Sequence, residues 1–266
     1  MKTINYLYPN GGKRAVTFSY DDNHDANRRL VETFNRYGIK GTFHLNAGAF
    51  DQPEHLRSDE IAVLFTGHEI ADHSTDHPFL SQQPTEAVLS QLLDDRAQLE
   101  QLAGYPVKGF SYPFGDYRAD VVSMTKSAGY VYARTCSHSY DVFWPDDFMR
   151  WNPSCHHYEF DKVFSKVEEV SRWNPIALLF IWGHAFEFER NNDWDFLDEM
   201  CKKVSSIPNV WLATNIEIMD YLVALRSLRW SMDGSTVDNP SRLDILVEID
   251  DMPIVVSPGF NKLALE

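Results

Sequence analysis

Carboxylate and imidazole side chains follow three strand-like segments of this sequence, at the point where each segment ends. Asp21 and Asp22 follow the first segment, His73 and His77 the second, and His184 the third. Adjacent carboxylates repel each other, and a bound cation relieves that repulsion. Two imidazoles four residues apart can reach one metal ion, and neutral imidazole suits zinc, cobalt, nickel or iron. These residues therefore indicate metal chemistry, although each group alone also fits a structural role, such as an acidic turn or a buried histidine.

Strand-like and helix-like segments alternate along residues 14–225, which is the pattern of a parallel sheet covered by helices. The polar residues described above lie at the carboxyl ends of strands, where the active sites of barrel enzymes are found. We therefore predict an α/β fold, a distorted TIM-like (β/α) barrel of about seven strands. Strands are expected at 14–20, 40–46, 68–73, 108–112, 130–135, 148–152, 176–182 and 210–213, and helices at 27–37, 58–65, 85–103, 118–128, 161–173, 193–206 and 215–225.

The alternation stops near residue 226, where short strand-like segments replace it. These segments are separated by Asp-Gly, Asn-Pro, Asp-Asp and Pro-Gly pairs, which favour turns. We predict that residues 1–225 form the barrel and that residues 226–266 form a small antiparallel β appendage packed on it.

Composition excludes several classes of protein. The 266 residues are 44% hydrophobic and 24% charged, as in globular domains, and the net charge is −15. An acidic chain argues against nucleic acid or an anionic membrane surface as a partner. The longest apolar run has seven residues, 176–182, against about 20 for a membrane span. The first residues lack the apolar region of a secretory signal, and the three cysteines form no CxxC pair, so we expect a cytoplasmic location.

Four motifs occur in order, each at the end of a predicted strand: VTFSYDD, HSTDH, GFSYPFG and LLFIWGH. Together they resemble the polysaccharide deacetylases, which are carbohydrate esterase family 4 with the NodB-homology domain. The resemblance covers about residues 12–215. It implies a distorted (β/α) barrel, often with seven strands, and it does not extend to the tail.

The resemblance also implies roles for individual residues. Asp22, His73 and His77 match the metal ligands of the family, which would hold one divalent ion, with zinc preferred and cobalt, nickel or manganese as alternatives. Asp21 matches the general base, and His184 matches the general acid that protonates the leaving group.

The segment SYPFG, residues 111–115, matches the motif that lines the pocket of the family. The backbone N–H of Phe114 would stabilise the oxyanion, and Pro113 would line the pocket. Tyr112, Trp151 and Trp182 are candidates for stacking on a sugar ring, although aromatic residues belong to the core more often.

The sequence departs from the family pattern at Ser111, where many members have an arginine that pairs with the catalytic Asp. An ionised Asp21 beside Asp22 needs positive charge nearby, and Ser111 cannot supply it. We predict that Arg150, in the expected strand 148–152, lies within hydrogen-bond reach of Asp21. The alternative is a surface Arg150 paired with Asp146 or Asp147.

The resemblance predicts a metal-dependent hydrolase that removes acetyl groups from N-acetylated or O-acetylated saccharides. A divalent ion would polarise the acetyl carbonyl and acidify water, Asp21 would accept a proton from that water, and His184 would protonate the departing amine or alcohol. Two alternatives stay open: a cyclic-amide hydrolase of the allantoinase kind on a similar fold, and a non-catalytic saccharide-binding pseudoenzyme. The sequence specifies neither the substrate nor the oligomeric state.

Overall fold

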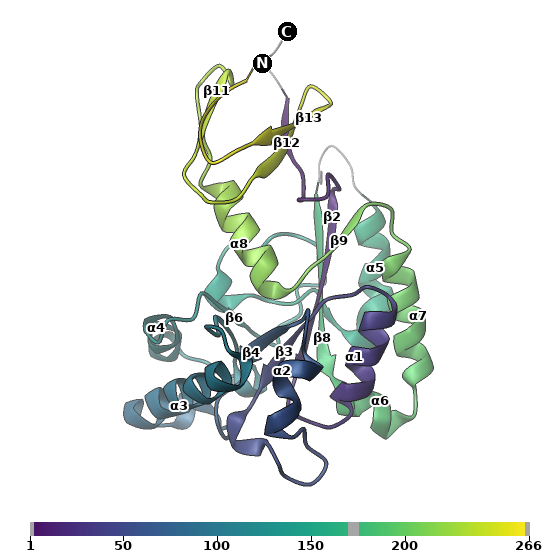
Figure 1. Ribbon diagram of the computed structural model, residues 1–266, viewed down its shortest axis with the longest axis vertical. Helices are drawn as coiled ribbons and strands as arrows, with labels where there is room; N and C mark the ends of the chain where they lie inside the picture. The colour runs from purple at the N-terminus through teal and green to yellow at the C-terminus, as the bar shows by residue number, and fades with distance from the viewer. Residues whose placement is uncertain (1–2, 170–175, 264–266) are drawn as a thin grey trace.

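The computed structural model describes residues 3–169 and 176–263. In its larger part, strands and helices alternate along the chain (Figure 1). The strands are β2 (Arg14–Asp21), β3 (Gly41–Leu45), β4 (Glu69–Asp72), β5 (Gly109–Ser111), β6 (Tyr132–Arg134), β7 (Cys155–His156), β8 (Ala177–His184) and β9 (Val210–Leu212). The helices are α1 (Asn27–Arg36), α2 (Ile61–Leu64), α3 (Thr85–Ala103), α4 (Ala119–Ser127), α5 (Phe160–Glu168), α6 (Ala185–Asn191), α7 (Trp194–Ser205) and α8 (Asn215–Arg226).

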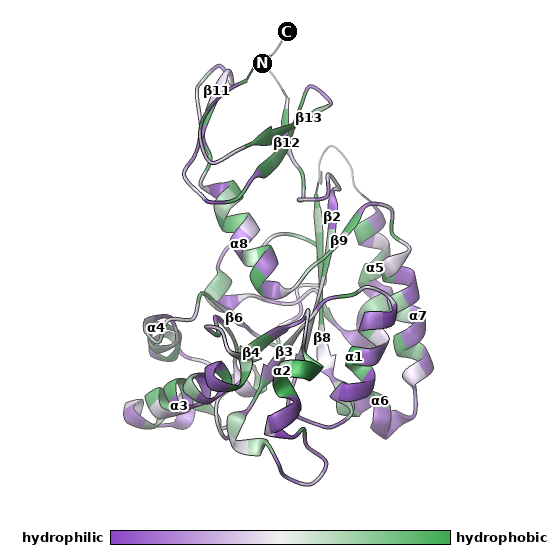
Figure 2. Cartoon of the chain, in the orientation of Figure 1, coloured by the Kyte–Doolittle hydropathy of each residue, from purple (hydrophilic) through white to green (hydrophobic). Residues whose placement is uncertain are grey.

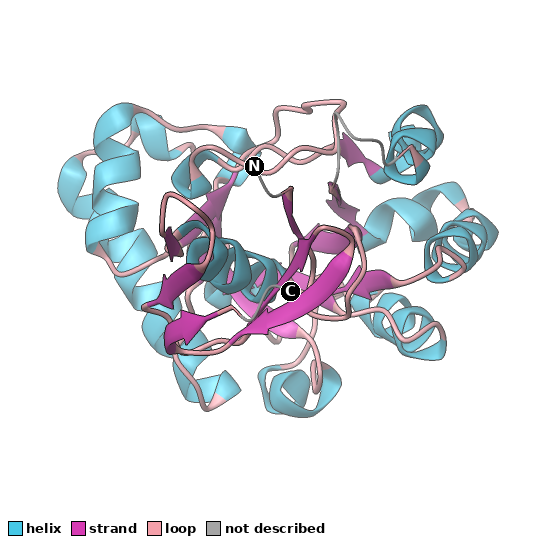
Figure 3. Ribbon diagram, turned by 90° about the horizontal axis from the view of Figure 1, so that it is seen from above, coloured by secondary structure: helices cyan, strands magenta, loops and turns pink. Residues whose placement is uncertain are grey.

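The strands form one parallel sheet in the order β6-β5-β4-β3-β2-β8-β7. Strand β2 is central: all eight of its residues pair with β8, while its other edge pairs first with β9 and then with β3. Both β2 and β8 are almost entirely buried, and β8 is mostly apolar, as expected for strands covered on both faces. Figure 3 shows the helices around the outside of the strands.

The two ends of this curled sheet are linked by a short irregular segment. Trp151 pairs with Arg134 at the end of β6, while Cys155 and His156 pair with β8. The predicted barrel-like arrangement of about seven strands is therefore confirmed. The strand expected at 148–152 is wrong, because residues 148–150 form a 3₁₀ turn in which Asp147 accepts a hydrogen bond from the Met149 N–H. The expected helix end at 170–173 lies outside the described residues.

A small β region lies at one end of the molecule, beyond α8 (Figure 1). It contains two antiparallel sheets, β1-β12-β13 and β10-β11-β14. Strand β12 is among the most hydrophobic parts of this region (Figure 2), and it packs with α8 in the same apolar cluster. The first strand of the chain joins the last ones here. The bounds are β1 (Ile4–Tyr6), β10 (Arg229–Trp230), β11 (Thr236–Asn239), β12 (Ile245–Ile249), β13 (Met252–Val256) and β14 (Gly259–Lys262).

No helix of the described ranges is long and apolar enough to cross a membrane.

Candidate active site

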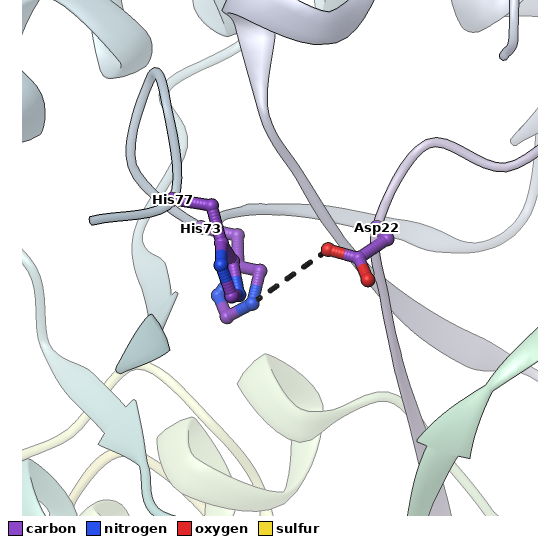
Figure 4. A group of neighbouring side chains, drawn as sticks. All are labelled: Asp22, His73 and His77. Carbon is purple, nitrogen blue, oxygen red and sulfur yellow. Dashed lines mark ion pairs between the residues drawn. The ribbon is translucent and has the colours of Figure 1, made fainter. Parts of the chain in front are cut away.

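The three predicted metal ligands lie together at the carboxyl ends of two strands (Figure 4). Asp22 follows β2, His73 follows β4, and His77 lies in the loop after His73. One donor atom from each residue lies within 4.8 Å of the other two, and His73 Nε2 is 4.0 Å from Asp22 Oδ1. Ligands about 2.0–2.2 Å from a tetrahedral ion lie roughly 3.4 Å apart, so a small contraction would complete the site.

The orientation of His73 suits a metal ligand. Its Nδ1 donates to the carbonyl oxygen of Ser111 at 2.8 Å, which leaves the lone pair of Nε2 facing the two carboxylates, 3.7 Å from Asp21 Oδ2 and 4.0 Å from Asp22 Oδ1. Burial lowers the pKa of His73 to about 3, so the imidazole is neutral at physiological pH, as a metal ligand must be. Two imidazoles and one carboxylate form a donor set that fits zinc, cobalt or nickel.

Four residues of this site have unusual backbone conformations. Asp22, Ser74, His77 and Phe114 have positive φ angles of 70°, 65°, 53° and 58°. Such conformations are costly for residues other than glycine, and they persist only where the surroundings hold them. Here the side-chain amide of Asn46 donates to the carbonyl oxygens of His73 and Ser74, at 2.7 and 2.9 Å. The fold therefore fixes the loop that carries both histidines.

Asp21 lies beside the metal ligands and is buried. Its Oδ2 accepts a hydrogen bond from the Arg134 guanidinium, and its Oδ1 accepts one from the Ser111 hydroxyl at 3.3 Å. Burial raises the pKa of Asp21, but Arg134 and the nearby histidines outweigh that effect and hold the pKa well below its usual range. Asp21 is therefore ionised at neutral pH, as a base must be.

The prediction that Arg150 pairs with Asp21 is wrong. Arg150 lies in the 3₁₀ turn 148–150, is exposed, and pairs with Asp147 at 3.1 Å. Arg134 takes the expected place, fully buried at the end of β6. The register of β6 explains why Arg134 takes this place, because Arg134 pairs with Ser111 on the adjacent strand β5. The charge that many family members carry on one strand is supplied here from the next strand.

His184 ends β8 directly beside Asp21, its register partner on β2. Its Nδ1 lies 3.4 Å from the carboxylate of Glu187, one turn later in α6. Burial lowers the pKa of His184, but Glu187, Asp21 and Asp22 outweigh burial and raise the pKa above its ordinary value. The raised pKa favours the protonated imidazole, which is the form that can give a proton to a leaving group. The four sequence motifs end before Glu187, so this contact could be identified only from the structure.

The predicted metal ligands, Asp21 and His184 all line one cleft of about 430 Å³. The residues that line this cleft are Asp21, Asp22, His73, His77, Phe114, Cys136, Trp182, His184 and Phe186. A second cleft of about 500 Å³ adjoins the first and shares Asp22, His77 and Phe186 with it. The predicted substrate residue Trp182 and the predicted oxyanion residue Phe114 thus reach the cleft.

Other predicted substrate residues do not reach it. Tyr112 and Trp151 are buried in the core, and the Tyr112 hydroxyl donates to the Met149 carbonyl, so the prediction that they stack on a sugar is wrong. Pro113 is also buried, where it fixes the turn before Phe114. The exposed Phe79, which the sequence did not single out, stacks on Phe114 with ring centroids 4.0 Å apart.

Comparisons with known proteins agree with this geometry. The family model described as "Polysaccharide deacetylase" matches residues 9–133. The peptidoglycan-N-acetylglucosamine deacetylase PgdA of Listeria monocytogenes is 28% identical over 101 residues, which are 38% of this chain and 21% of the relative. The peptidoglycan-N-acetylmuramic acid deacetylase PdaC of Bacillus subtilis is 27% identical over 119 residues, 44% of this chain and 25% of the relative. The chain thus covers about a quarter or less of the length of these two relatives.

Solved structures share the fold. A putative polysaccharide deacetylase from Mycobacterium smegmatis superposes with a TM-score of 0.62 at 18% identity, over 85% of this chain and 96% of the other. A mutant of a CE4-family pseudoenzyme with restored activity gives a TM-score of 0.56 at 17% identity, over 81% of this chain and 70% of the other. These likenesses establish the NodB-like (β/α) barrel for the larger part of the chain.

Proposed function

We propose that this chain, which belongs to the polysaccharide deacetylase family, removes acetyl groups from N-acetylated saccharides with the help of one divalent metal ion. One observation carries the proposal. The structure brings an Asp-His-His donor set, the buried carboxylate of Asp21 and the imidazole of His184 to one cleft at the carboxyl ends of β2, β4 and β8. Family membership alone would not distinguish an enzyme from a pseudoenzyme, whereas a full set of these groups favours an enzyme.

Asp22, His73 and His77 would hold the ion. When bound, a divalent ion supplies Lewis-acid chemistry to an amide carbonyl and to water. The donor set favours zinc, and cobalt, nickel and manganese are the other ions to test.

The chain's own residues supply the proton transfers. The Asp21 carboxylate, held ionised by Arg134, accepts a proton from the attacking water. His184 contacts Glu187 through Nδ1, so its Nε2 is the atom that protonates the departing amine. The backbone N–H of Phe114 is available to the oxyanion, because the positive φ at this residue turns the peptide at the cleft.

The substrate class follows from the relatives and the cleft. The named relatives are peptidoglycan deacetylases, and the two adjoining clefts leave room for sugar units on either side of the metal ligands. We therefore propose an N-acetylated glycan or a fragment of one, with an O-acetyl sugar as the second candidate. The cytoplasmic location expected from the sequence stays a prediction.

A substrate panel tests the proposal. Acetate and ammonia release would be measured with N-acetylglucosamine oligomers, acetylated sugars and cyclic ureides, after reloading with zinc, cobalt, nickel or manganese. Acetate from the oligomers supports the deacetylase. Ring opening of the ureides would instead support the allantoinase-like alternative. Binding of the oligomers without turnover by any metal form would support a pseudoenzyme.

The Glu187→Gln variant is expected to shift the alkaline limb of the kcat/KM profile to lower pH by roughly one unit. The carboxylate of Glu187 raises the pKa of His184, and the amide keeps the size of the side chain without its charge. His184 therefore loses its proton at lower pH, and activity falls with it. The pH profile of kcat/KM measures this shift. Glu189→Gln is the control, since Glu189 bonds to Trp194 instead, and an unmoved limb in Glu187→Gln would exclude this role.

Loss of the exposed aromatic ring in Phe79→Ala is expected to raise KM about 3–10-fold with little change in kcat. An aromatic contact contributes about 0.5–1.5 kcal/mol beyond its buried area. Phe79 stacks on Phe114, which lines the cleft, and Phe79 is not itself among the lining residues that include the reacting groups. Steady-state kinetics with the oligomer substrate measure the effect, and Phe260→Ala, an exposed ring on β14, is the control. An unchanged KM would mean that the sugar does not contact this ring.

A further inference from the structure

A second group of metal-ligand side chains lies behind His184. It consists of His156 at the end of β7, His157 directly after it, and Glu187 in α6. Glu187 Oε2 lies 3.0 Å from His156 Nε2 and 3.4 Å from His157 Nε2. These distances match the roughly 3.4 Å that separates two ligands of one tetrahedral zinc ion. The donor atoms are thus closer together here than His73 and Asp22 are in the proposed catalytic site.

The imidazole of His157 is the unusual member of this group. It is fully buried, and neither of its ring nitrogens has a hydrogen-bond partner among the described residues. A buried polar group without a partner is costly, so such a group calls for an explanation. The absence of a side chain at Gly183 makes the position possible, because a Cβ there would lie 2.0 Å from His157 Nδ1.

We propose that His156, His157 and Glu187 form a second site for a divalent ion of the zinc class, separate from the Asp22–His73–His77 site. Two imidazole nitrogens and one carboxylate oxygen are ligands that zinc, cobalt and nickel accept. Bound metal would satisfy Nε2 of His157, which makes no hydrogen bond to the described residues and has only the 3.4 Å contact with Glu187. His156 and Glu187 retain some exposure, so they give the ion a way in.

The tautomer of His156 indicates that this site is the weaker one. Ligation through Nε2 places the proton on Nδ1, where His156 now accepts a long hydrogen bond of 3.4 Å from the Tyr158 N–H. That contact is lost when the metal binds. His73 needs no such change, because its Nδ1 already donates to a carbonyl oxygen. The second ion should therefore bind after the first.

Occupation of the second site should inhibit the proposed reaction. The Oε2 atom that would bind the ion is the atom that faces His184 Nδ1 at 3.4 Å. A metal ion on Oε2 would take this oxygen from His184, so the imidazole of the proposed general acid would lose the contact that orients it. This consequence rests on the proposed function, whereas the binding site itself does not.

Zinc binding to the whole chain tests the site. Metal-free protein would be dialysed against increasing zinc, and bound zinc per chain would be measured by mass spectrometry. We expect two equivalents for the unmodified chain, with the second bound more weakly. His156→Asn should lose the weaker equivalent only, and His77→Ala the tighter one only. His138→Asn is the matched control and should keep both, because His138 is engaged by Glu159 and Trp182.

A crystal of the unmodified chain soaked in zinc gives a second measurement, which does not depend on the folding of any variant. Anomalous density between His156, His157 and Glu187 supports the site. A single equivalent up to millimolar zinc, or a second equivalent retained in His156→Asn, overturns it. For the inhibition, kcat should fall at least tenfold as the second equivalent binds, and this fall should be absent in His156→Asn. Two bound ions with unchanged kcat would keep the site and reject the inhibition.

Discussion

The Asp21→Asn substitution is expected to lower kcat about 10²–10⁴-fold, the usual range for loss of a general base. Asn has nearly the same size as Asp and can keep a bond to Arg134, but it cannot accept a proton from water. Asp21 is not one of the three side chains that form the proposed metal site. The metal should therefore stay bound while turnover is lost.

Acetate release and bound metal per chain, measured on the same sample, check this result. Asp147→Asn is the matched control, because Asp147 is exposed, does not line the cleft of the proposed active site, and contacts Arg150 and the Met149 N–H. Turnover within threefold of the unmodified enzyme in Asp21→Asn would remove Asp21 from the mechanism. Loss of metal would instead make Asp21 a ligand.

The Arg134→Met substitution is expected to destabilise the fold by about 3–5 kcal/mol, because it leaves the Asp21 charge buried without its partner. Arg134 is fully buried, donates to Asp21, and lies over the Trp182 ring at 4.5 Å. Without the guanidinium, the pKa of Asp21 should rise towards or above its ordinary value, because burial then dominates. The acidic limb of kcat/KM should move to higher pH.

The sign for stability follows from the same pKa. The folded-state pKa of Asp21 lies below its unfolded value, so the pair stabilises the protein above the unfolded pKa, near 4, and this stabilisation is lost as the pH falls below it. Urea unfolding at pH 7 and at acidic pH measures the difference. The loss of stability in Arg134→Met should be largest near neutral pH.

Arg150→Met is the matched control, with the same change at an exposed ion pair, and should cost at most about 1 kcal/mol. Arg134→Lys keeps a positive charge at this position, so it still tests the assignment if Arg134→Met does not fold. Arg134→Lys should be more stable than Arg134→Met, and the acidic limb of its kcat/KM profile should be displaced less. An equal effect of Arg134→Met and Arg150→Met on stability and on the limb would contradict the assignment.

The sequence predicted those parts of the site that depend on strand ends. Asp21, Asp22, His73 and His184 each follow or end a strand that the apolar pattern located, and parallel strands bring their carboxyl ends to one edge. The alternation of elements likewise predicted the sheet and its helices. Such features depend on residues that are close together in the sequence, so a single sequence is enough to predict them.

Contacts that depend on register could not be located in the same way. The expected strand 130–135 contained Arg134, but motif order favoured Arg150, and only the pairing of Ser111 with Arg134 shows which arginine faces Asp21. The burial of individual side chains could not be predicted from the sequence either. Trp151 and Trp182 are the same residue type near strand ends, yet Trp151 lies in the core and Trp182 lines the cleft.

Long-range pairing also determined the β region. The segment Ile4–Tyr6 has no strong strand pattern of its own, and it is ordered by β12, more than 200 residues later in the chain. Chain order gives no sign of such a pairing, so the N-terminal residues were assigned to the barrel. The division of the chain at residue 225 stays a prediction.

The central claim is that a metal ion at Asp22, His73 and His77 is required for deacetylation. The most direct test is acetate release from N-acetylglucosamine oligomers by the same preparation before chelation, after chelation, and after addition of one equivalent of zinc, with His77→Ala treated in parallel. We predict that chelation abolishes release, that one equivalent restores it, and that His77→Ala stays inactive at that equivalent. Full activity of the metal-free protein, or of His77→Ala without bound metal, would contradict the account.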